Sequence, residues 1–267
     1  GGGGTATAAW MSSGQGTSPA PPNPTATYFY NGTAWTDQSA AVTNNTWYMG
    51  STGTQAAALM GAGGNPVNPG YNYTLCEEWG GSSWSVITAI PSPQRRYCAG
   101  FGTANTACII SGTTIPSNPV NNVDLWNGTS WSSEGNCLTG RSTSGGCGLE
   151  TTGIFVGSGN PTEEYNGTAW SEGATYPNPT SGNTQGGTSA ACVAYGGNPA
   201  PNNTSTNSYD GTAWKTQGLM SDGRQWGASS DTGTTSSQLA TCGGSPAGNI
   251  DKTEEYTLGD AIKTVGT

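Results

Sequence analysis

The chain has 267 residues, of which only 9% are charged, and its seven Lys and Arg residues leave a formal net charge of −9. Nucleic-acid binding needs a basic surface, so this composition argues against a nucleic-acid partner. No apolar run approaches the roughly 20 residues that span a bilayer, and we expect no membrane insertion. The 10 Trp and 11 Tyr residues indicate packed cores rather than disorder.

A short segment with an aromatic residue at each end recurs along the chain. Its leading aromatics are Tyr30, Trp79, Trp126, Tyr165 and Tyr209, and the Trp residues that close it are Trp35, Trp84, Trp131, Trp170 and Trp214. A sixth copy begins at Tyr256 and lacks the Trp. Four copies hold Asn-Gly or Asp-Gly between the two aromatics, which favours a hairpin with a type I′ turn and positive φ at both central residues.

A second marker precedes each copy, and a third precedes three of the copies. One is a small apolar run that ends in glycine, with Gly64, Gly197 and Gly244 as closing residues. The other is an arginine, represented by Arg96, Arg141 and Arg224, which follows the preceding repeat Trp by 10 to 12 residues. Together the markers predict four short strands per repeat, which is typical of a propeller blade.

We therefore predict an all-β fold, a single six-bladed β-propeller domain over residues 1–267. The expected four-stranded blades are residues 1–42, 43–92, 93–139, 140–178, 179–221 and 222–267. Aligning Gly4 with Gly53 starts the chain just before the second strand of blade one, so that blade is expected to lack its first strand. Residues 261–265 are expected to form the last strand of blade six. A ring left open at this seam would expose strand edges that could bind another chain.

The order Arg, Gly-Gly, Tyr, Trp resembles the kelch repeat, and blade four matches it best through Arg141, Gly157, Tyr165 and Trp170. The run from Thr162 to Trp170 also resembles kelch-type proteins of tailed phages that infect aquatic cyanobacteria. This resemblance implies a virion structural or tail-fibre protein with a role in host attachment. It places the chain on a virion surface or outside cells, with other virion or extracellular proteins as partners, through the seam or otherwise.

Histidine is absent, so neither a Ser-His-Asp triad nor a His-dependent metal site can be built. We predict no catalytic residues, no metal and no cofactor. The seven cysteines contain no Cys-x-x-Cys pair and are interpreted as buried thiols. Three Glu-Glu pairs lie in predicted third strands, at Glu77, Glu163 and Glu254, and are interpreted as solvated blade edges because strand neighbours point to opposite faces.

The candidate ligand-binding residues fall into two groups. Arg96, Arg141 and Arg224 could converge on an anion at one mouth of the central channel, or could bind backbone carbonyls of a neighbouring blade. Tyr71 and Tyr73 lie in a Pro- and Asn-rich loop that could stack against sugars, or could simply connect two strands. The leading hypothesis is a non-enzymatic structural or attachment propeller. A lectin that binds cell-surface glycan is the alternative, and a glycan-cleaving enzyme that uses carboxylates is a third.

Overall fold

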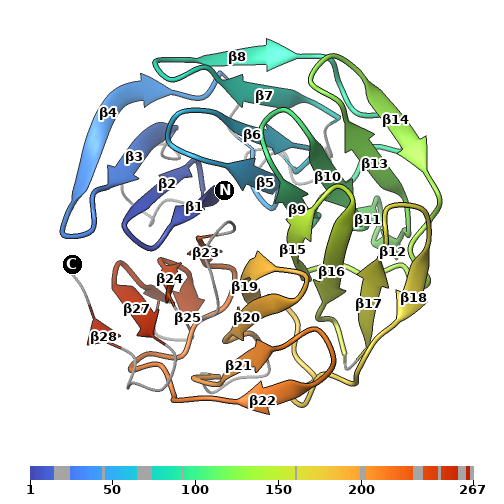
Figure 1. The fold of residues 1–267 in the computed structure, drawn as a ribbon. Coiled ribbons are helices and arrows are strands. Elements are labelled where there is room, and N and C mark those ends of the chain that lie inside the picture. The colour runs from blue at the N-terminus through green and yellow to red at the C-terminus, as the bar shows by residue number, and fades with distance from the viewer. Residues whose placement is uncertain are drawn as a thin grey trace.

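The computed structural model describes residues 1–14, 25–43, 46–64, 74–91, 93–159, 161–198, 203–230, 237–245, 248–257 and 263–264. Six four-stranded antiparallel sheets are arranged around one central axis, which confirms the predicted all-β, six-bladed β-propeller (Figure 1). Nothing in the described ranges is a helix of the length and apolarity that crossing a membrane requires.

The first three blades take up the chain in order. Blade one is β1 (Gly2–Thr5), β2 (Ala8–Ser12), β3 (Ala26–Tyr30) and β4 (Trp35–Ala41). Blade two is β5 (Gly50–Gly53), β6 (Ala58–Gly61), β7 (Cys76–Trp79) and β8 (Trp84–Ile87). Blade three is β9 (Ala99–Gly102), β10 (Ala107–Ile110), β13 (Val123–Trp126) and β14 (Trp131–Glu134), with a small hairpin of β11 (Thr113–Thr114) and β12 (Asn118–Pro119).

The last three blades follow the same plan. Blade four is β15 (Gly145–Leu149), β16 (Thr152–Val156), β17 (Thr162–Tyr165) and β18 (Trp170–Glu172). Blade five is β19 (Thr184–Thr188), β20 (Ala191–Tyr195), β21 (Thr206–Tyr209) and β22 (Trp214–Thr216). Blade six is β23 (Ala228–Ser229), β24 (Ser237–Thr241), β27 (Thr253–Thr257) and β28 (Lys263–Thr264), with a hairpin of β25 (Gly244–Ser245) and β26 (Gly248–Asn249).

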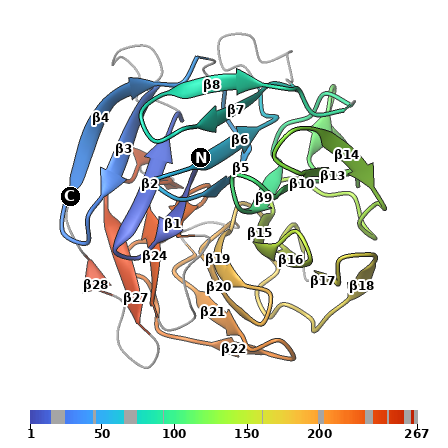
Figure 2. The ribbon, with the colours of Figure 1, turned by 45° about the horizontal axis from the view of Figure 1, so that its top comes forward.

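Glycine allows the first strands to crowd around the axis, as Figures 1 and 2 show from two directions. A Cβ atom on Gly50 would lie 2.7 Å from the carbonyl oxygen of Ala99 in the next blade. One on Gly100 would lie 2.5 Å from the amide nitrogen of Ser51. The inner strands of neighbouring blades are therefore too close for side chains at these positions.

The seam between blades six and one corrects one expectation and confirms another. Blade one has its first strand, because β1 pairs with β2 from Gly2 opposite Met11 to Thr5 opposite Ala8. Gly4 and Gly53 both lie in the first strands of their blades, so their alignment is correct. The expectation that Gly4 comes after the first strand is wrong. The predicted last strand is confirmed at Lys263–Thr264, where β28 pairs with β27.

Each repeat Trp opens the fourth strand of its blade and packs against the aromatic that closes the third. Ring centroids are 4.9 to 5.7 Å apart in the five blades, from Tyr209–Trp214 to Trp79–Trp84. Three of the indole N–H groups also donate to a threonine hydroxyl in the preceding blade: Trp84 to Thr27, Trp214 to Thr162, and Trp35 to Thr253. The last bond crosses the seam, so blades six and one are joined by the same contact as other neighbours.

Two departures from this threonine rule leave buried polar atoms unpaired. Trp170 in blade four faces a blade whose corresponding residue is Val123, and its Nε1 has no partner among the described residues. Blade six carries no repeat Trp, and the hydroxyl of Thr206 in blade five is buried without a described partner. Trp170 therefore lacks its threonine acceptor, and Thr206 lacks its tryptophan donor.

The predicted type I′ turn is wrong. Tyr30 pairs directly with Trp35, so the loop between them has four residues, 31–34, and only Gly32 among them has positive φ, at +91°. The Asn31 side-chain oxygen instead accepts hydrogen bonds from the backbone amides of Thr33 and Ala34. Because this side chain closes the turn, the residue needs no left-handed backbone.

Candidate functional site

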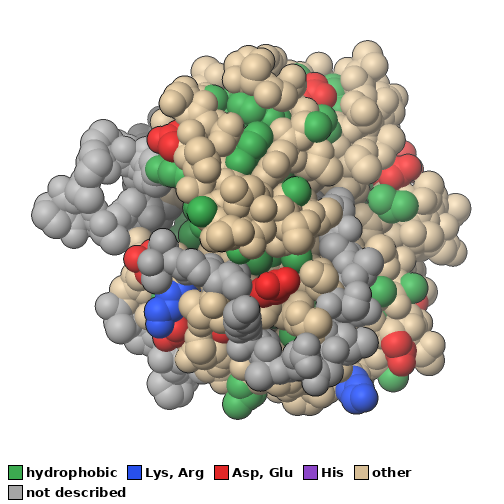
Figure 3. Space-filling view, turned by 60° about the vertical axis from the view of Figure 1, so that its left-hand side comes forward, with side chains coloured by type: hydrophobic (Ala, Val, Ile, Leu, Met, Phe, Trp, Pro, Cys, Tyr) green, Lys and Arg blue, Asp and Glu red, His purple; other side chains and the backbone are tan. Residues whose placement is uncertain are grey.

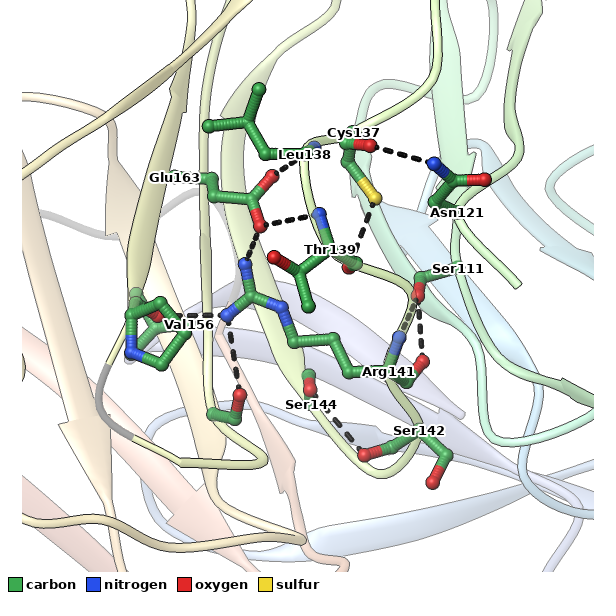
Figure 4. A network of polar contacts seen from close by, with 12 residues as sticks. Ser111, Asn121, Cys137, Leu138, Thr139, Arg141, Ser142, Ser144, Val156 and Glu163 are labelled. Atoms are coloured by element: carbon green, nitrogen blue, oxygen red, sulfur yellow. Dashed lines mark hydrogen bonds and ion pairs between the residues drawn. The ribbon is translucent and has the colours of Figure 1, made fainter. Parts of the chain in front are cut away.

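Arg141 lies in a buried network inside blade four (Figure 4). Its side chain forms an ion pair with Glu163 of β17, and Nη1 donates to the carbonyls of Gly157 and Pro161 at 3.2 and 2.7 Å. The guanidinium carbon lies 4.4 Å from the centre of the Phe155 ring. Arg141 is only 3% exposed, so its charge is balanced by Glu163 inside the blade.

Glu163 has a second task at the boundary between blades three and four. Its carboxylate accepts the backbone amides of Leu138 and Thr139 at 2.7 and 3.1 Å, in the segment that enters blade four (Figure 4). A buried carboxylate needs such donors as well as its counter-charge, because desolvation is expensive. The pair therefore fixes the connection between two blades.

The same arrangement recurs as Arg224 with Glu254 and as Arg95 with Asp124. Arg95, rather than Arg96, thus occupies the repeat position, and the predicted equivalence of Arg96 with Arg141 and Arg224 is wrong. The Arg96 guanidinium instead lies 5.2 Å from the centre of the Tyr97 ring. A shift of one residue changes which side of the strand a side chain takes.

These pairs overturn three related expectations. Arg141 and Arg224 do not converge at the channel mouth, because each is buried in its own blade. The carbonyls that they bind also belong to their own blade rather than to a neighbour. Glu77, Glu163 and Glu254 are buried, not solvated, and only the second Glu of each pair is partly exposed.

The glycine markers connect blades through the backbone. The amides of Gly63, Gly112 and Gly197 donate to the carbonyls of Arg95, Arg141 and Arg224 in the next blade, at 2.8 to 3.0 Å. Gly63 and Gly197 have φ of +104° and +101°, so glycine is favoured there. Of the predicted closing glycines, Gly197 is such a donor, whereas Gly64 and Gly244 lie one residue later and bridge to Trp47 and Gln225.

A cavity of about 670 Å³ opens at one end of the central channel and is lined by residues of all six blades. The described lining includes five aromatic residues: Tyr28, Trp47, Tyr48, Tyr97 and Trp226. Of these, Tyr48, Tyr97 and Trp226 share one position in their blades. Each lies two residues after the repeat-arginine position of its blade, which Thr46 holds in blade two. None of the three is a repeat Trp or Tyr, so the repeat pattern does not mark them. Their constant offset was the signal that could have identified them.

A chain of backbone hydrogen bonds runs around this mouth. The amide of Tyr97 donates to the carbonyl of Tyr48, Thr143 to Tyr97, Gly182 to Thr143, and Trp226 to Gly182. All five residues have left-handed φ, from +56° at Thr143 to +70° at Gly182. Bulky and β-branched residues rarely adopt this conformation, and strain of this kind gathers at functional sites.

Trp226 forms an open aromatic platform in the mouth. A Cβ atom on Gly182 would lie 2.6 Å from Trp226 Nε1, so the indole lies directly against bare backbone. Tyr48 contacts Trp226 edge-on at 6.0 Å and stacks on Tyr97 at 4.2 Å. Trp226 is nevertheless 47% exposed, which is unusual for a side chain held this firmly.

The polar groups around the platform are mostly uncharged. The described lining includes the side chains of Asn183, Gln185 and Gln225 together with several Ser and Thr residues. Asp251 has the one charged side chain in that described lining, which also includes the N-terminal amino group of Gly1, and burial lowers the pKa of that amino group to about 6. Figure 3 shows a similar scarcity on one outer face, where charged side chains are scattered singly. The mouth can therefore hold a neutral ligand with an apolar face and several hydroxyl or amide groups.

The remaining predicted residues are two tyrosines and the seven cysteines. Tyr71 and Tyr73 lie outside the described residues. Six of the seven cysteines are buried and outside any disulfide, as expected, and Cys242 is partly exposed. Burial raises the pKa of Cys76 and Cys137 to about 12, so both stay protonated at neutral pH. The described residues contain no cluster of three or more His, Cys, Asp or Glu that could hold a metal ion.

No protein-family model matches the chain, and neither does any curated protein. Among solved structures, the chain is similar to one described as "Structure of YjhT", with a TM-score of 0.77 and 14% sequence identity. The match covers 99% of this chain and 96% of that chain. At this identity the likeness supports the fold alone, and that fold is the six-bladed β-propeller.

Proposed function

We propose that this protein is a non-enzymatic, carbohydrate-binding β-propeller that serves in attachment on a virion surface or outside cells. The observation that carries the proposal is the exposed Trp226 platform in a cavity lined by uncharged amides and hydroxyls. Pyranose rings have an apolar face that stacks on aromatic rings, while their hydroxyls bond to amide side chains. Both kinds of group meet at this mouth.

The proposed location rests on the sequence. The order of Arg, Gly, Tyr and Trp markers resembles kelch repeats. The amino-acid sequence of the run from Thr162 to Trp170 resembles kelch-type proteins of tailed phages. In such a setting, other virion or extracellular proteins would carry the propeller and a cell-surface glycan would be its ligand. Attachment is favoured over a purely structural role because a buried scaffold gains nothing from exposing Trp226.

A glycan array with the intact protein tests this proposal. We expect binding to neutral glycans, and the variant Trp226→Ala should weaken it by about tenfold or more, as loss of a central aromatic anchor does. Leu219→Ala is the matched control, since Leu219 is 63% exposed and lies outside the cavity lining. Failure to retain any glycan, or equal binding by Trp226→Ala, would contradict the proposal. Release of sugar fragments would show an enzyme instead.

A further inference from the structure

Three exposed turns share one unusual side-chain geometry. Asn31, Asn127 and Asn166 each precede a glycine, and each side-chain oxygen accepts two backbone amides, from the second and third residues after it. The distances are 3.0 and 2.9 Å in all three turns. The glycines have φ between +88° and +91°. Near-identical geometry in three blades gives three copies of one chemical environment.

This environment favours attack on the side-chain carbonyl. The following residue is glycine, so no side chain hinders its backbone nitrogen as it approaches Cγ of the asparagine. Negative charge then develops on Oδ1, where two amide N–H groups are already aimed. Preorganised donors at a developing oxyanion lower the barrier of acyl transfer, and the same physics applies within one chain.

Blade five shows what the product of such a reaction would look like. Asp210 takes the place of the asparagine, and its Oδ1 accepts the amides of Thr212 and Ala213 at 2.9 and 2.8 Å. These backbone bonds hold the pKa of Asp210 below its ordinary value. Hydrogen bonds to a carboxylate are stronger than those to a neutral amide. The turn therefore accommodates Asp at least as well as Asn.

We propose that Asn31, Asn127 and Asn166 are sites of spontaneous deamidation, whose aspartate product has the form that Asp210 already has. The glycine nitrogen forms a bond to Cγ, the Cγ–Nδ2 bond breaks, and Nδ2 leaves as ammonia with the glycine amide proton. Water then adds to the cyclic imide and breaks the new Cγ–N bond, which leaves an aspartate. Where water adds at the backbone carbonyl instead, the bond from that carbonyl to the glycine nitrogen breaks and leaves isoaspartate, which is ordinarily the larger product.

The change affects the face opposite the mouth. Loops between third and fourth strands lie at the opposite edge of an antiparallel blade from those between second and third strands. Up to three further negative charges would thus appear there on a chain whose formal net charge is −9. Sugar binding at the mouth is untouched, so this inference stands or falls separately from the proposed function.

Site-resolved peptide mass spectrometry of protein aged in mildly alkaline buffer tests the inference. Asn31, Asn127 and Asn166 should convert to Asp and isoAsp well ahead of Asn105, which is also exposed but precedes Thr106. Thr168→Pro removes one amide donor to Asn166 and should slow conversion there by about tenfold or more. Asn31 and Asn127 are unchanged in that variant and serve as internal controls.

Three outcomes would overturn the inference. The three asparagines could convert no faster than Asn105, although they convert readily once the protein is unfolded in urea. Thr168→Pro could leave the rate at Asn166 equal to that at Asn127. All three asparagines lie in Asn-Gly-Thr, which fits the Asn-x-Ser/Thr pattern of N-glycosylation. A glycan on their side-chain nitrogens would also show that another modification uses these sites. In contrast, Asn166→Asp should fold normally and keep or raise the melting temperature.

Discussion

Blades four and five solve the same packing problem in opposite ways. In blade four the buried pair of Arg141 and Glu163 ties the blade to the segment that enters it. In blade five the corresponding residues are Thr180 and Asn207, and the Tyr176 hydroxyl lies 3.3 Å from the Asn207 side-chain nitrogen, which donates to it. The buried contact is an ion pair in blade four and a neutral hydrogen bond in blade five.

The segment that enters each blade explains why the charges disappear together. Glu163 accepts the amide of Leu138, but blade five has Pro177 at that position, which has no N–H to donate. A carboxylate there would lose one of its two amide donors as well as its arginine. Because an unpaired buried charge is far costlier than a neutral amide, loss of one member favours loss of all.

The largest loss of stability should come from breaking the ion pair between Arg141 and Glu163. Glu163→Gln leaves the Arg141 charge buried without a counter-charge and should lower the free energy of unfolding by about 3–5 kcal/mol. Chemical denaturation measures this loss directly. Glu172→Gln, at an exposed position of β18 in the same blade, should change stability little. Similar losses for both variants would show that the ion pair contributes nothing special.

The neutral hydrogen bond between Asn207 and Tyr176 should contribute less to stability than the ion pair. Tyr176→Phe removes the hydroxyl that Asn207 contacts and should cost about 1–2 kcal/mol, the usual penalty for an unsatisfied buried polar group. The same denaturation assay applies. If Tyr176→Phe cost as much as Glu163→Gln, the distinction between the two blades would be lost.

The tryptophan contacts sharpen the comparison at the two borders of blade four. Thr162→Val removes the acceptor of Trp214 at the border with blade five and should cost about 1 kcal/mol. Val123→Thr supplies an acceptor for Trp170 at the border with blade three and should stabilise by a similar or smaller amount. A melting temperature that falls in both variants would mean that Trp170 cannot use the new hydroxyl.

At neutral pH the smallest effect concerns Cys137 and Tyr176, which lie at corresponding positions before blades four and five. Burial raises the pKa of each to about 12. Their contribution is complete below the ordinary values, about 8.5 for a thiol and 10 for a phenol, and is lost as pH rises towards 12. Cys137→Ala and Tyr176→Phe should therefore each flatten the alkaline decline of the melting temperature. An unchanged decline in both variants would contradict these raised pKa values.

The sequence by itself determined the blade number, the strand order and the place of each repeat Trp. These features repeat within about 45 residues of chain, and hairpin strands are neighbours in sequence as well as in space. The same local reasoning failed where no local signal exists. The strand β1 is Gly-Gly-Gly-Thr, which carries no hydrophobic pattern, and it is defined by its pairing with β2. A Cβ atom on Gly2 or Gly4 would lie within 3 Å of neighbouring atoms, so glycine suits both positions.

Only the tertiary structure decided which arginine is the repeat residue and which aromatic residues meet at the channel mouth. Arg95 and Arg96 are adjacent in sequence, and the carboxylate of Asp124 in the third strand selects between them. Tyr48, Tyr97 and Trp226 come from three blades and meet because the ring brings equivalent positions to one mouth. Spacing along the chain specifies each blade, but closure of the ring brings residues far apart in sequence into one site.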